Sequence, residues 1–207
     1  MLRIAKASDA GPIAAIYRPY VETTAISFEE APPSAEEIEA KIARVGSIFP
    51  FIVFEEGGEV LGYAYATRYR DRAAYRWSLE DSVYVRGDSV GRGIGRALLG
   101  ALVGLLRELG YVKIYAVITP PNPPSVRLHE SFGFESLGRF ADTAFLEKNI
   151  CQAFFGHQRV WVFRSKYPRL NRQHLPMQFL ALGQAAFIGE DARKVGHNDG
   201  RVPMFEP

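Results

Sequence analysis

The protein is 207 residues long, 47% hydrophobic and 23% charged, the composition of an ordinary globular chain with room for one full core and an appendage. Its formal net charge is +2, from 25 Lys and Arg against 23 Asp and Glu, and like charges form no run of five or more, so nucleic acid is not an implied partner. No apolar run reaches the roughly 18 residues of a membrane-spanning helix, and the N-terminus has no secretion signal, so neither a membrane span nor secretion is expected. The single cysteine, Cys151, cannot form an intramolecular disulfide, which favours a reducing cytoplasm.

The chain opens with the pattern of a strand followed by two helices. Residues 2–5 predict a short strand, and Ser8 and Asp9 are an N-terminal signal for a helix whose apolar residues recur at helical spacing. Residues 35–45 are good helix formers with acidic residues in the first turn, and Ser34 is the expected cap.

Extended patterns begin near residue 49. Residues 51–54 and 60–67 are rich in β-branched and aromatic side chains and are separated by a Gly57-Gly58 turn, which predicts an antiparallel hairpin. A third strand is expected at 77–85, after an arginine-rich connection.

A glycine loop and an amphipathic helix follow this third strand. The loop leads into a leucine-rich helical stretch that ends at Gly110, and residues 111–118 read as a buried strand. Asn122, followed by proline, predicts the start of a short helix that ends near Phe132. After about residue 142 the periodicity weakens: residues 158–164 are a candidate strand, and the remainder shows no sustained pattern.

The glycine loop has the chemistry of a phosphate site. Glycines at 91, 93 and 95 expose backbone N–H groups at a helix start, where the helix dipole also favours an anion. A Walker loop would continue with Lys and Ser or Thr, and a dinucleotide fingerprint would place a small residue where Leu98 stands, so neither fits. A loop between an antiparallel strand and a helix suits the pyrophosphate of coenzyme A. The alternative is that the glycines merely shape a tight turn.

Four longer motifs occur in order along residues 3–140. They are Ser27-Phe28-Glu29, Gly62-Tyr63-Ala64-Tyr65-Ala66, the run from Arg70 to Val85 that contains Trp77-Ser78-Leu79-Glu80, and Pro121-Asn122-Pro123-Pro124-Ser125-Val126-Arg127-Leu128-His129-Glu130. With these motifs the chain resembles the GNAT acetyltransferases, most closely their phosphinothricin and methionine sulfoximine N-acetyltransferase branch. This resemblance implies an α/β (α+β) GNAT fold over residues 1–145, with a mixed, mostly antiparallel sheet flanked by helices and a divergent C-terminal segment at 146–207.

The resemblance implies acetyl-CoA as cosubstrate. The family's usual Arg or Gln in the loop is replaced by Val90, and Arg92 or Arg96 is expected to compensate. An amide near Val83 is the natural donor to the oxyanion that acyl transfer creates. The residues implied in cofactor binding are the loop residues Gly91, Arg92, Gly93, Ile94, Gly95 and Arg96, the backbone of Val83, Tyr84 and Val85, and the side chains of Asn122 and Ser125.

Glu80 is the first candidate for catalysis. An ammonium has no lone pair, so acetylation of an amine requires a proton acceptor beside the substrate. The resemblance places Glu80 in that role, directly or through a water molecule, whereas a strand glutamate taken alone would be a surface or ion-paired carboxylate.

His129 is the second candidate. It lies one helical turn after Ser125 and titrates near neutral pH, and the resemblance implies participation in proton transfer. A lone helix histidine is otherwise a polar surface or packing residue.

The segment before the third strand is the candidate substrate site. Guanidinium groups suit the carboxylate and tetrahedral oxygens of an amino-acid analogue, although a short arginine-rich loop is ordinarily a solvated connection. The resemblance implies a substrate site made of Phe28, Glu29, Arg70, Arg72 and Tyr75.

Other chemistries have less support in the sequence. The four histidines are far apart and form no metal-binding motif, so no metal is expected.

The predicted reaction is direct attack by a small-molecule amine on acetyl-CoA, in a chain that the resemblance implies is a homodimer. Two alternatives stay open: a GNAT enzyme for another amine, such as a polyamine or a peptide N-terminus, and an acyl-CoA-binding module that has lost turnover.

Overall fold

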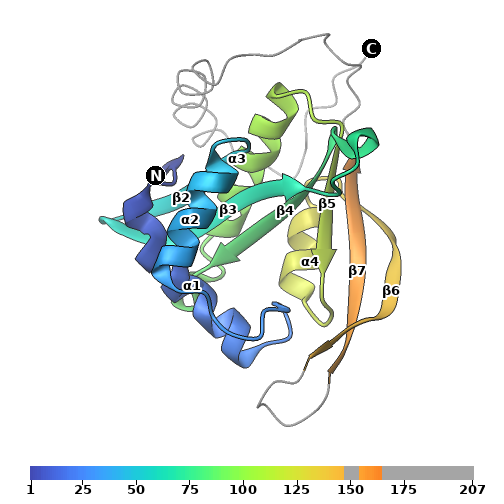
Figure 1. Ribbon diagram of the computed structural model, residues 1–207, viewed down its shortest axis with the longest axis horizontal. Helices are drawn as coiled ribbons and strands as arrows, with labels where there is room; N and C mark the ends of the chain where they lie inside the picture. The colour runs from blue at the N-terminus through green and yellow to red at the C-terminus, as the bar shows by residue number, and fades with distance from the viewer. Residues whose placement is uncertain (147–153, 165–207) are drawn as a thin grey trace.

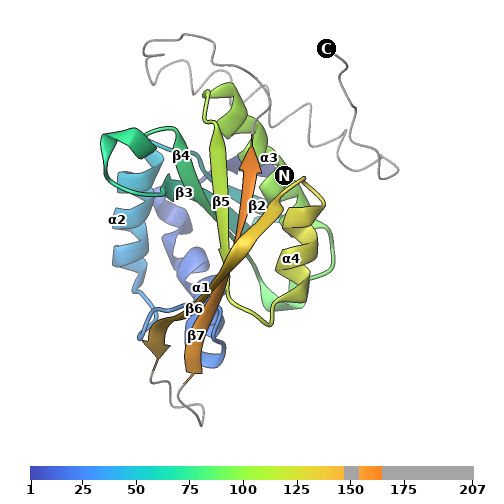
Figure 2. The same cartoon turned by 90° about the vertical axis from the view of Figure 1, so that its right-hand side faces the viewer.

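A computed structural model describes residues 1–146 and 154–164 of the chain. These residues form one seven-stranded sheet with the order β1-β2-β3-β4-β5-β7-β6, in which β4 and β5 are parallel and the other neighbours antiparallel. Helices α1 and α2 lie against one face of the sheet, and α3 and α4 lie against the other (Figures 1 and 2). Cys151 and residues 165–207 lie outside the described residues.

The N-terminal elements form as the sequence predicts, with one difference at the first helix. Strand β1 (Leu2–Ile4) leads through a 3-10 turn (Ala7–Asp9) into α1 (Ala10–Thr23). Asp9 does not cap α1 with its side chain; its carboxylate accepts from the Lys6 amide at 2.7 Å and binds the Arg3 guanidinium at 2.6 Å. Arg3 of β1 thus binds the carboxylate that could otherwise accept hydrogen bonds from the first amides of α1.

Helix α2 (Ala35–Gly46) carries the predicted cap. The Ser34 hydroxyl accepts from the Glu37 amide at 3.2 Å, and the Glu37 carboxylate accepts from the Ser34 amide at 2.7 Å, which completes a capping box. Its apolar residues pack with α1 onto the hairpin of β2 (Phe51–Glu56) and β3 (Glu59–Arg68), which turns at the predicted glycine pair.

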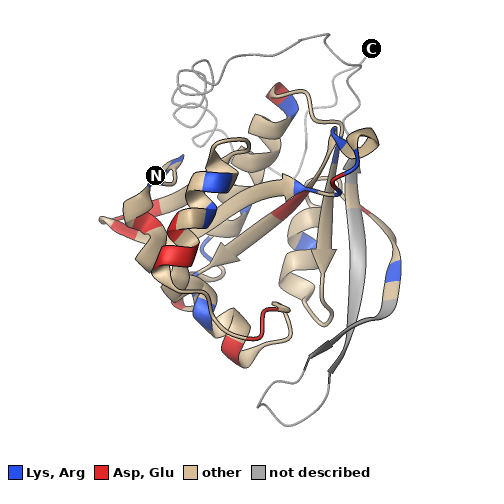
Figure 3. Cartoon of the chain, in the orientation of Figure 1, with Lys and Arg blue, Asp and Glu red and all other residues tan. Residues whose placement is uncertain are grey.

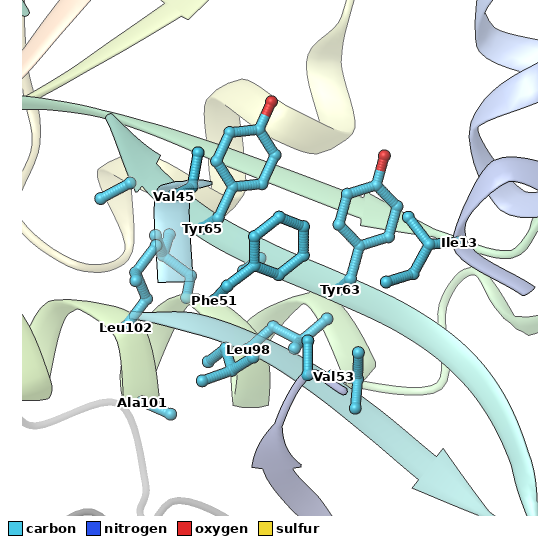
Figure 4. Close-up of a cluster of buried hydrophobic side chains, with 14 of the residues drawn as sticks. Ile13, Val45, Phe51, Val53, Tyr63, Tyr65, Leu98, Ala101 and Leu102 are labelled. Atoms are coloured by element: carbon cyan, nitrogen blue, oxygen red, sulfur yellow. The ribbon is translucent and has the colours of Figure 1, made fainter. Parts of the chain in front are cut away.

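The core holds aromatic rings on the α1 and α2 side and leucines on the α3 side. Phe51 stacks on Tyr65 with ring centroids 4.9 Å apart, and Tyr63 lies beside them (Figure 4). Helix α3 (Ile94–Glu108) contributes Leu98 and Leu102, both fully buried. Its amphipathic pattern therefore fixes the start of α3, and with it the glycine loop, against β3 and β4 (Ser78–Val85).

The remaining elements complete the sheet beyond β4. Strand β5 (Lys113–Ile118) is followed by α4 (Pro123–Glu130), whose N-cap Asn122 accepts from the Ser125 amide at 3.3 Å. Strands β6 (Glu135–Leu146) and β7 (Phe154–Arg164) form an antiparallel pair, and β7 also pairs with β5. The expected division at residue 145 thus falls within a strand, and the sheet continues to Arg164.

Charge is mixed over the molecule. Figure 3 shows basic and acidic residues interspersed among the helices and strand ends, in keeping with the small net charge. No helix in the described ranges is both long and apolar enough to cross a membrane.

Candidate active site

A cavity of about 780 Å³ opens where β4 and β5 separate. The two strands are in register from the Ser78–Lys113 pair to the Glu80–Tyr115 pair, and beyond that point no pairing between them continues in the described structure. The cavity is lined by residues 80–85 of β4, the end of β5, the glycine loop, α4 and the segment after α1.

The backbone of β4 faces the cavity at alternate residues. The Arg86 amide donates to the Leu61 carbonyl and the Tyr69 amide to the Ser78 carbonyl, which fixes the hydrogen-bonding phase between β3 and β4. By that alternation Tyr84 turns its amide and carbonyl toward β3, whereas Val83 and Val85 turn theirs toward the gap. The Val85 carbonyl already accepts from the Tyr20 hydroxyl at 2.5 Å. The backbone groups predicted for the cofactor are thus available at Val83 and at the Val85 amide, and not at Tyr84.

Glu80 projects from β4 at the point where the strands part. Its side chain is partly buried, lines the cavity, and forms no hydrogen bond or ion pair with another residue that the structure describes. Burial, and secondarily the charge of Asp81, raise the pKa of Glu80 above its ordinary value of 4.5. A carboxylate with a raised pKa and no fixed partner is suited to accept a proton.

His129 lies on the opposite side of β4 from Glu80 and is held at both ring nitrogens. Nε2 is 3.0 Å from Asp81 Oδ2, and Nδ1 is 2.7 Å from the Ser125 carbonyl and 3.3 Å from the Ser125 hydroxyl. The ring is 4% exposed and packs edge-on against Phe134. Burial lowers the pKa of His129, but the hydrogen bond and charge of Asp81 and the Ser125 carbonyl outweigh it, so the pKa lies above 6.5.

The glycine loop lines the cavity with its backbone. Gly91 and Gly93 have φ of 85° and 81°, a left-handed conformation that favours glycine, and Gly93 is the N-cap of α3. Gly95 also lines the cavity, whereas Ile94 is buried in the core. The loop therefore offers N–H groups at a helix start, as a phosphate site requires.

The two arginines expected to compensate for Val90 lie in different places. Arg92 forms an ion pair with Glu56 and is not part of the cavity wall. Arg96 lines the cavity, where its guanidinium lies over the Phe132 ring at 5.4 Å and donates to Ser131 Oγ at 3.3 Å. Arg96 forms no ion pair with any described residue, so no carboxylate of that part of the chain neutralises its charge at the cavity wall.

The predicted substrate residues separate into two groups. Phe28 and Glu29 line the cavity beside Ser27, whose hydroxyl is 2.7 Å from the Tyr17 hydroxyl. Arg70, Arg72 and Tyr75 are exposed on the connection before β4 and do not line the cavity within this chain.

Among the cavity residues that sequence reasoning missed, two are charged. Asp81 is 7% exposed and binds His129, and Arg127 places a second exposed guanidinium at the cavity beside Asn122 and Ser125 of the predicted set. The signal for Asp81 was its position two residues after the buried Leu79, because alternate strand residues share a face and a carboxylate on the buried face requires a partner. Arg127 carried no comparable signal.

Metal-binding groups do not gather in this part of the chain. Within residues 1–146 and 154–164 no three His, Cys, Asp or Glu side chains lie close enough to hold an ion.

Comparisons with known proteins agree with this geometry. The acetyltransferase (GNAT) domain family model matches residues 2–149. The chain is similar to phosphinothricin N-acetyltransferase of Alcaligenes faecalis, with 40% identity over 70% of this chain and 74% of that protein. It is also similar to L-methionine sulfoximine/L-methionine sulfone acetyltransferase of Pseudomonas paraeruginosa, with 34% identity over 72% and 94%. A crystal structure of a phosphinothricin acetyltransferase from Sinorhizobium meliloti in complex with acetyl-CoA superposes with a TM-score of 0.74 and 34% identity, over 83% of this chain and 93% of that one.

Proposed function

This chain belongs to the GNAT acetyltransferase family, and from that premise we propose that it acetylates the α-amino group of a small amino-acid analogue. Acetyl-CoA is the cosubstrate, as in the solved complex of a similar protein. The phosphinothricin and methionine sulfoximine or sulfone types are the proposed acceptors, because the two relatives described above carry those names.

One observation carries the proposed mechanism: Glu80 lies in the cavity where β4 and β5 part, partly buried and with no fixed partner among the described residues. It accepts the proton of the substrate ammonium, directly or through water, and the neutral nitrogen attacks the thioester carbon. The N–C bond forms first and gives a tetrahedral oxyanion; the C–S bond then breaks with its electron pair going to sulfur, and the nitrogen loses its second proton to solvent. The Val83 amide, turned toward the gap, donates to this oxyanion.

The cofactor is proposed to lie across the start of α3. The amides around Gly93 and Gly95 face its pyrophosphate, and Arg96 and Arg127 add positive charge at the same side of the cavity. Arg96 thereby takes over the charge that Val90 does not supply, and Arg92 does not, because Glu56 neutralises it.

The exposed Arg70 and Arg72 are proposed to reach the substrate carboxylate when a second copy of the chain closes the site, in a cytoplasmic homodimer. Sedimentation of the full-length chain tests the dimer. A monomer that retains full activity would overturn this part of the proposal.

Two further functions are distinguished by specific results. A GNAT enzyme for a polyamine or a peptide N-terminus would tolerate Arg72→Ala with an unchanged KM, because those acceptors lack the carboxylate that a guanidinium would bind. A module that binds acyl-CoA without turnover would bind acetyl-CoA in calorimetry and acetylate no amine.

The test is a screen of amines at fixed acetyl-CoA with full-length protein. Phosphinothricin, methionine sulfoximine and methionine sulfone should be acetylated with higher kcat/KM than spermidine or an alanine-terminated peptide. Turnover confined to the polyamine or the peptide would overturn the proposed substrate class.

A further inference from the structure

We propose that Asp81 is a positioning residue that holds His129 as a buried imidazolium, so that His129 serves as a proton donor on the cofactor side of β4 and not as the base for the substrate amine. The catalytic part rests on the proposed function. The protonation state of His129 does not, because it follows from contacts within the chain.

The hydrogen bonds around the ring define its charge. Nε2 faces the Asp81 carboxylate at 3.0 Å, and Nδ1 faces the Ser125 carbonyl at 2.7 Å. Both of these oxygens accept hydrogen bonds and neither donates, so each ring nitrogen carries a proton. An imidazole with protons on both nitrogens is a cation that cannot accept a further proton.

Burial makes the pair interdependent. The side chains of Asp81 and His129 are 1% and 5% exposed, so the cation is stable in this position only beside a counter-charge. The charged group that faces the ring from β4 is Asp81, the α4 groups are the carbonyl and hydroxyl of Ser125, and Phe134 packs edge-on at a centroid distance of 5.0 Å. The net direction of the His129 pKa, above its ordinary value, agrees with this arrangement.

The second oxygen of Asp81 supports a role beyond packing. Oδ1 is buried and has no hydrogen-bond partner among the described residues, although Asp81 lines the cavity. A buried carboxylate oxygen without a hydrogen-bond partner destabilises a fold, so a side chain selected for stability alone would not be a carboxylate. Its charge is explained by the imidazolium it holds.

Asp81 therefore divides the proton chemistry between the two sides of β4. Glu80 takes one proton of the substrate ammonium, and the nitrogen loses its second proton to solvent as the amide forms. When the C–S bond breaks, the leaving thiolate takes a proton from the Ser125 hydroxyl, which in turn takes the Nδ1 proton of His129 across 3.3 Å. Coenzyme A leaves as the thiol, His129 is left neutral beside the Asp81 carboxylate, and a proton from solvent restores the imidazolium.

The experiment is ¹⁵N NMR of the histidine side chains in full-length protein, wild type and Asp81→Asn, across neutral pH. Wild-type His129 should stay doubly protonated to higher pH than an exposed histidine. In Asp81→Asn, which keeps the shape and removes the charge, it should lose its proton at lower pH. In the same variant kcat should fall about tenfold or more, with its alkaline limb moved to lower pH, because a neutral ring is a poorer donor.

Three comparisons make the result decisive. Asp9→Asn removes another buried, ion-paired carboxylate remote from the cavity, and should leave the His129 titration unchanged even if stability falls. Ser125→Ala keeps the carbonyl acceptor, so it should lower kcat while His129 stays doubly protonated. Binding of acetyl-CoA by calorimetry establishes that Asp81→Asn is folded. A wild-type His129 that titrates at or below its ordinary pKa, or an Asp81→Asn variant with the wild-type titration, would overturn the inference even if no amine were acetylated.

Discussion

The two sides of β4 present neighbouring carboxylates in opposite states. Glu80 points toward the α1 and α2 side of the strand, has no fixed partner among the described residues and has a raised pKa. Asp81 points toward α4 and is bound to His129 at 3.0 Å. The two residues are adjacent in the chain, but strand alternation sends them to different environments. Asp81 is therefore engaged by a buried partner, whereas the desolvated, unpaired carboxylate of Glu80 is free to take up a proton.

The largest effect is expected at the unpaired carboxylate. Glu80→Gln should lower kcat by about 10² or more, because it removes the proton acceptor while keeping the side-chain shape. The KM for acetyl-CoA should change little. Steady-state kinetics in which acetyl-CoA is varied at a saturating concentration of the acceptor measure both quantities.

Glu39→Gln is the matched control, since Glu39 is an exposed glutamate of α2 outside the cavity wall. It should retain wild-type kcat. If kcat falls by no more than a few-fold in Glu80→Gln, Glu80 is not the base, and the proposed difference between the two sides of β4 is wrong.

A smaller effect is expected on the α3 and α4 side, where the cofactor is proposed to bind. Arg96→Ala should raise the KM for acetyl-CoA about tenfold with kcat nearly unchanged, because one charge-assisted hydrogen bond contributes about 1.5 kcal/mol. Arg92→Ala removes an arginine that Glu56 already neutralises, so its KM should stay close to wild type. Equal effects of the two substitutions would contradict the assignment of Arg96.

The last effect is on stability and not on activity, and it is confined to the α3 side. A Cβ added at Gly62 would lie 2.9 Å from the Tyr84 carbonyl and 3.0 Å from Leu98 Cδ1, so Gly62→Ala should destabilise the fold by about 1–3 kcal/mol in urea denaturation. Gly11, on α1, has no such neighbour within 4 Å, and Gly11→Ala should be neutral or stabilising by up to about 1 kcal/mol. Gly62→Ala as stable as wild type would show that α3 does not pack this closely.

Local patterns predicted much of this molecule because local physics decides them. The Ser34 cap, the β2–β3 hairpin and the start of α3 follow from hydrogen bonding and hydrophobic spacing within a few residues, and the structure contains all of them. The resemblance to the GNAT acetyltransferases implied that Glu80 and the glycine loop belong to one site, and both line the same cavity.

What sequence reasoning missed depends on contacts between distant residues. Asp81 meets His129 across 48 positions, and Arg92 is neutralised by Glu56 from 36 positions away. The Asp9 carboxylate does not cap α1, and it binds Arg3 instead. In each case folding places a charged side chain beside the residue in question, and local sequence patterns carry no information about that partner.

The pH dependence of kcat/KM for phosphinothricin, in wild type and Glu80→Gln, tests the central claim most directly. Because burial raises the pKa of Glu80 above 4.5, the wild-type rate should rise with pH through a range that begins above that value, as the carboxylate becomes ionised and able to accept a proton. In Glu80→Gln the rate should be low and this rise should be absent. A Glu80→Gln variant whose kcat/KM, however low, keeps the same rise with pH would show that another group is the base.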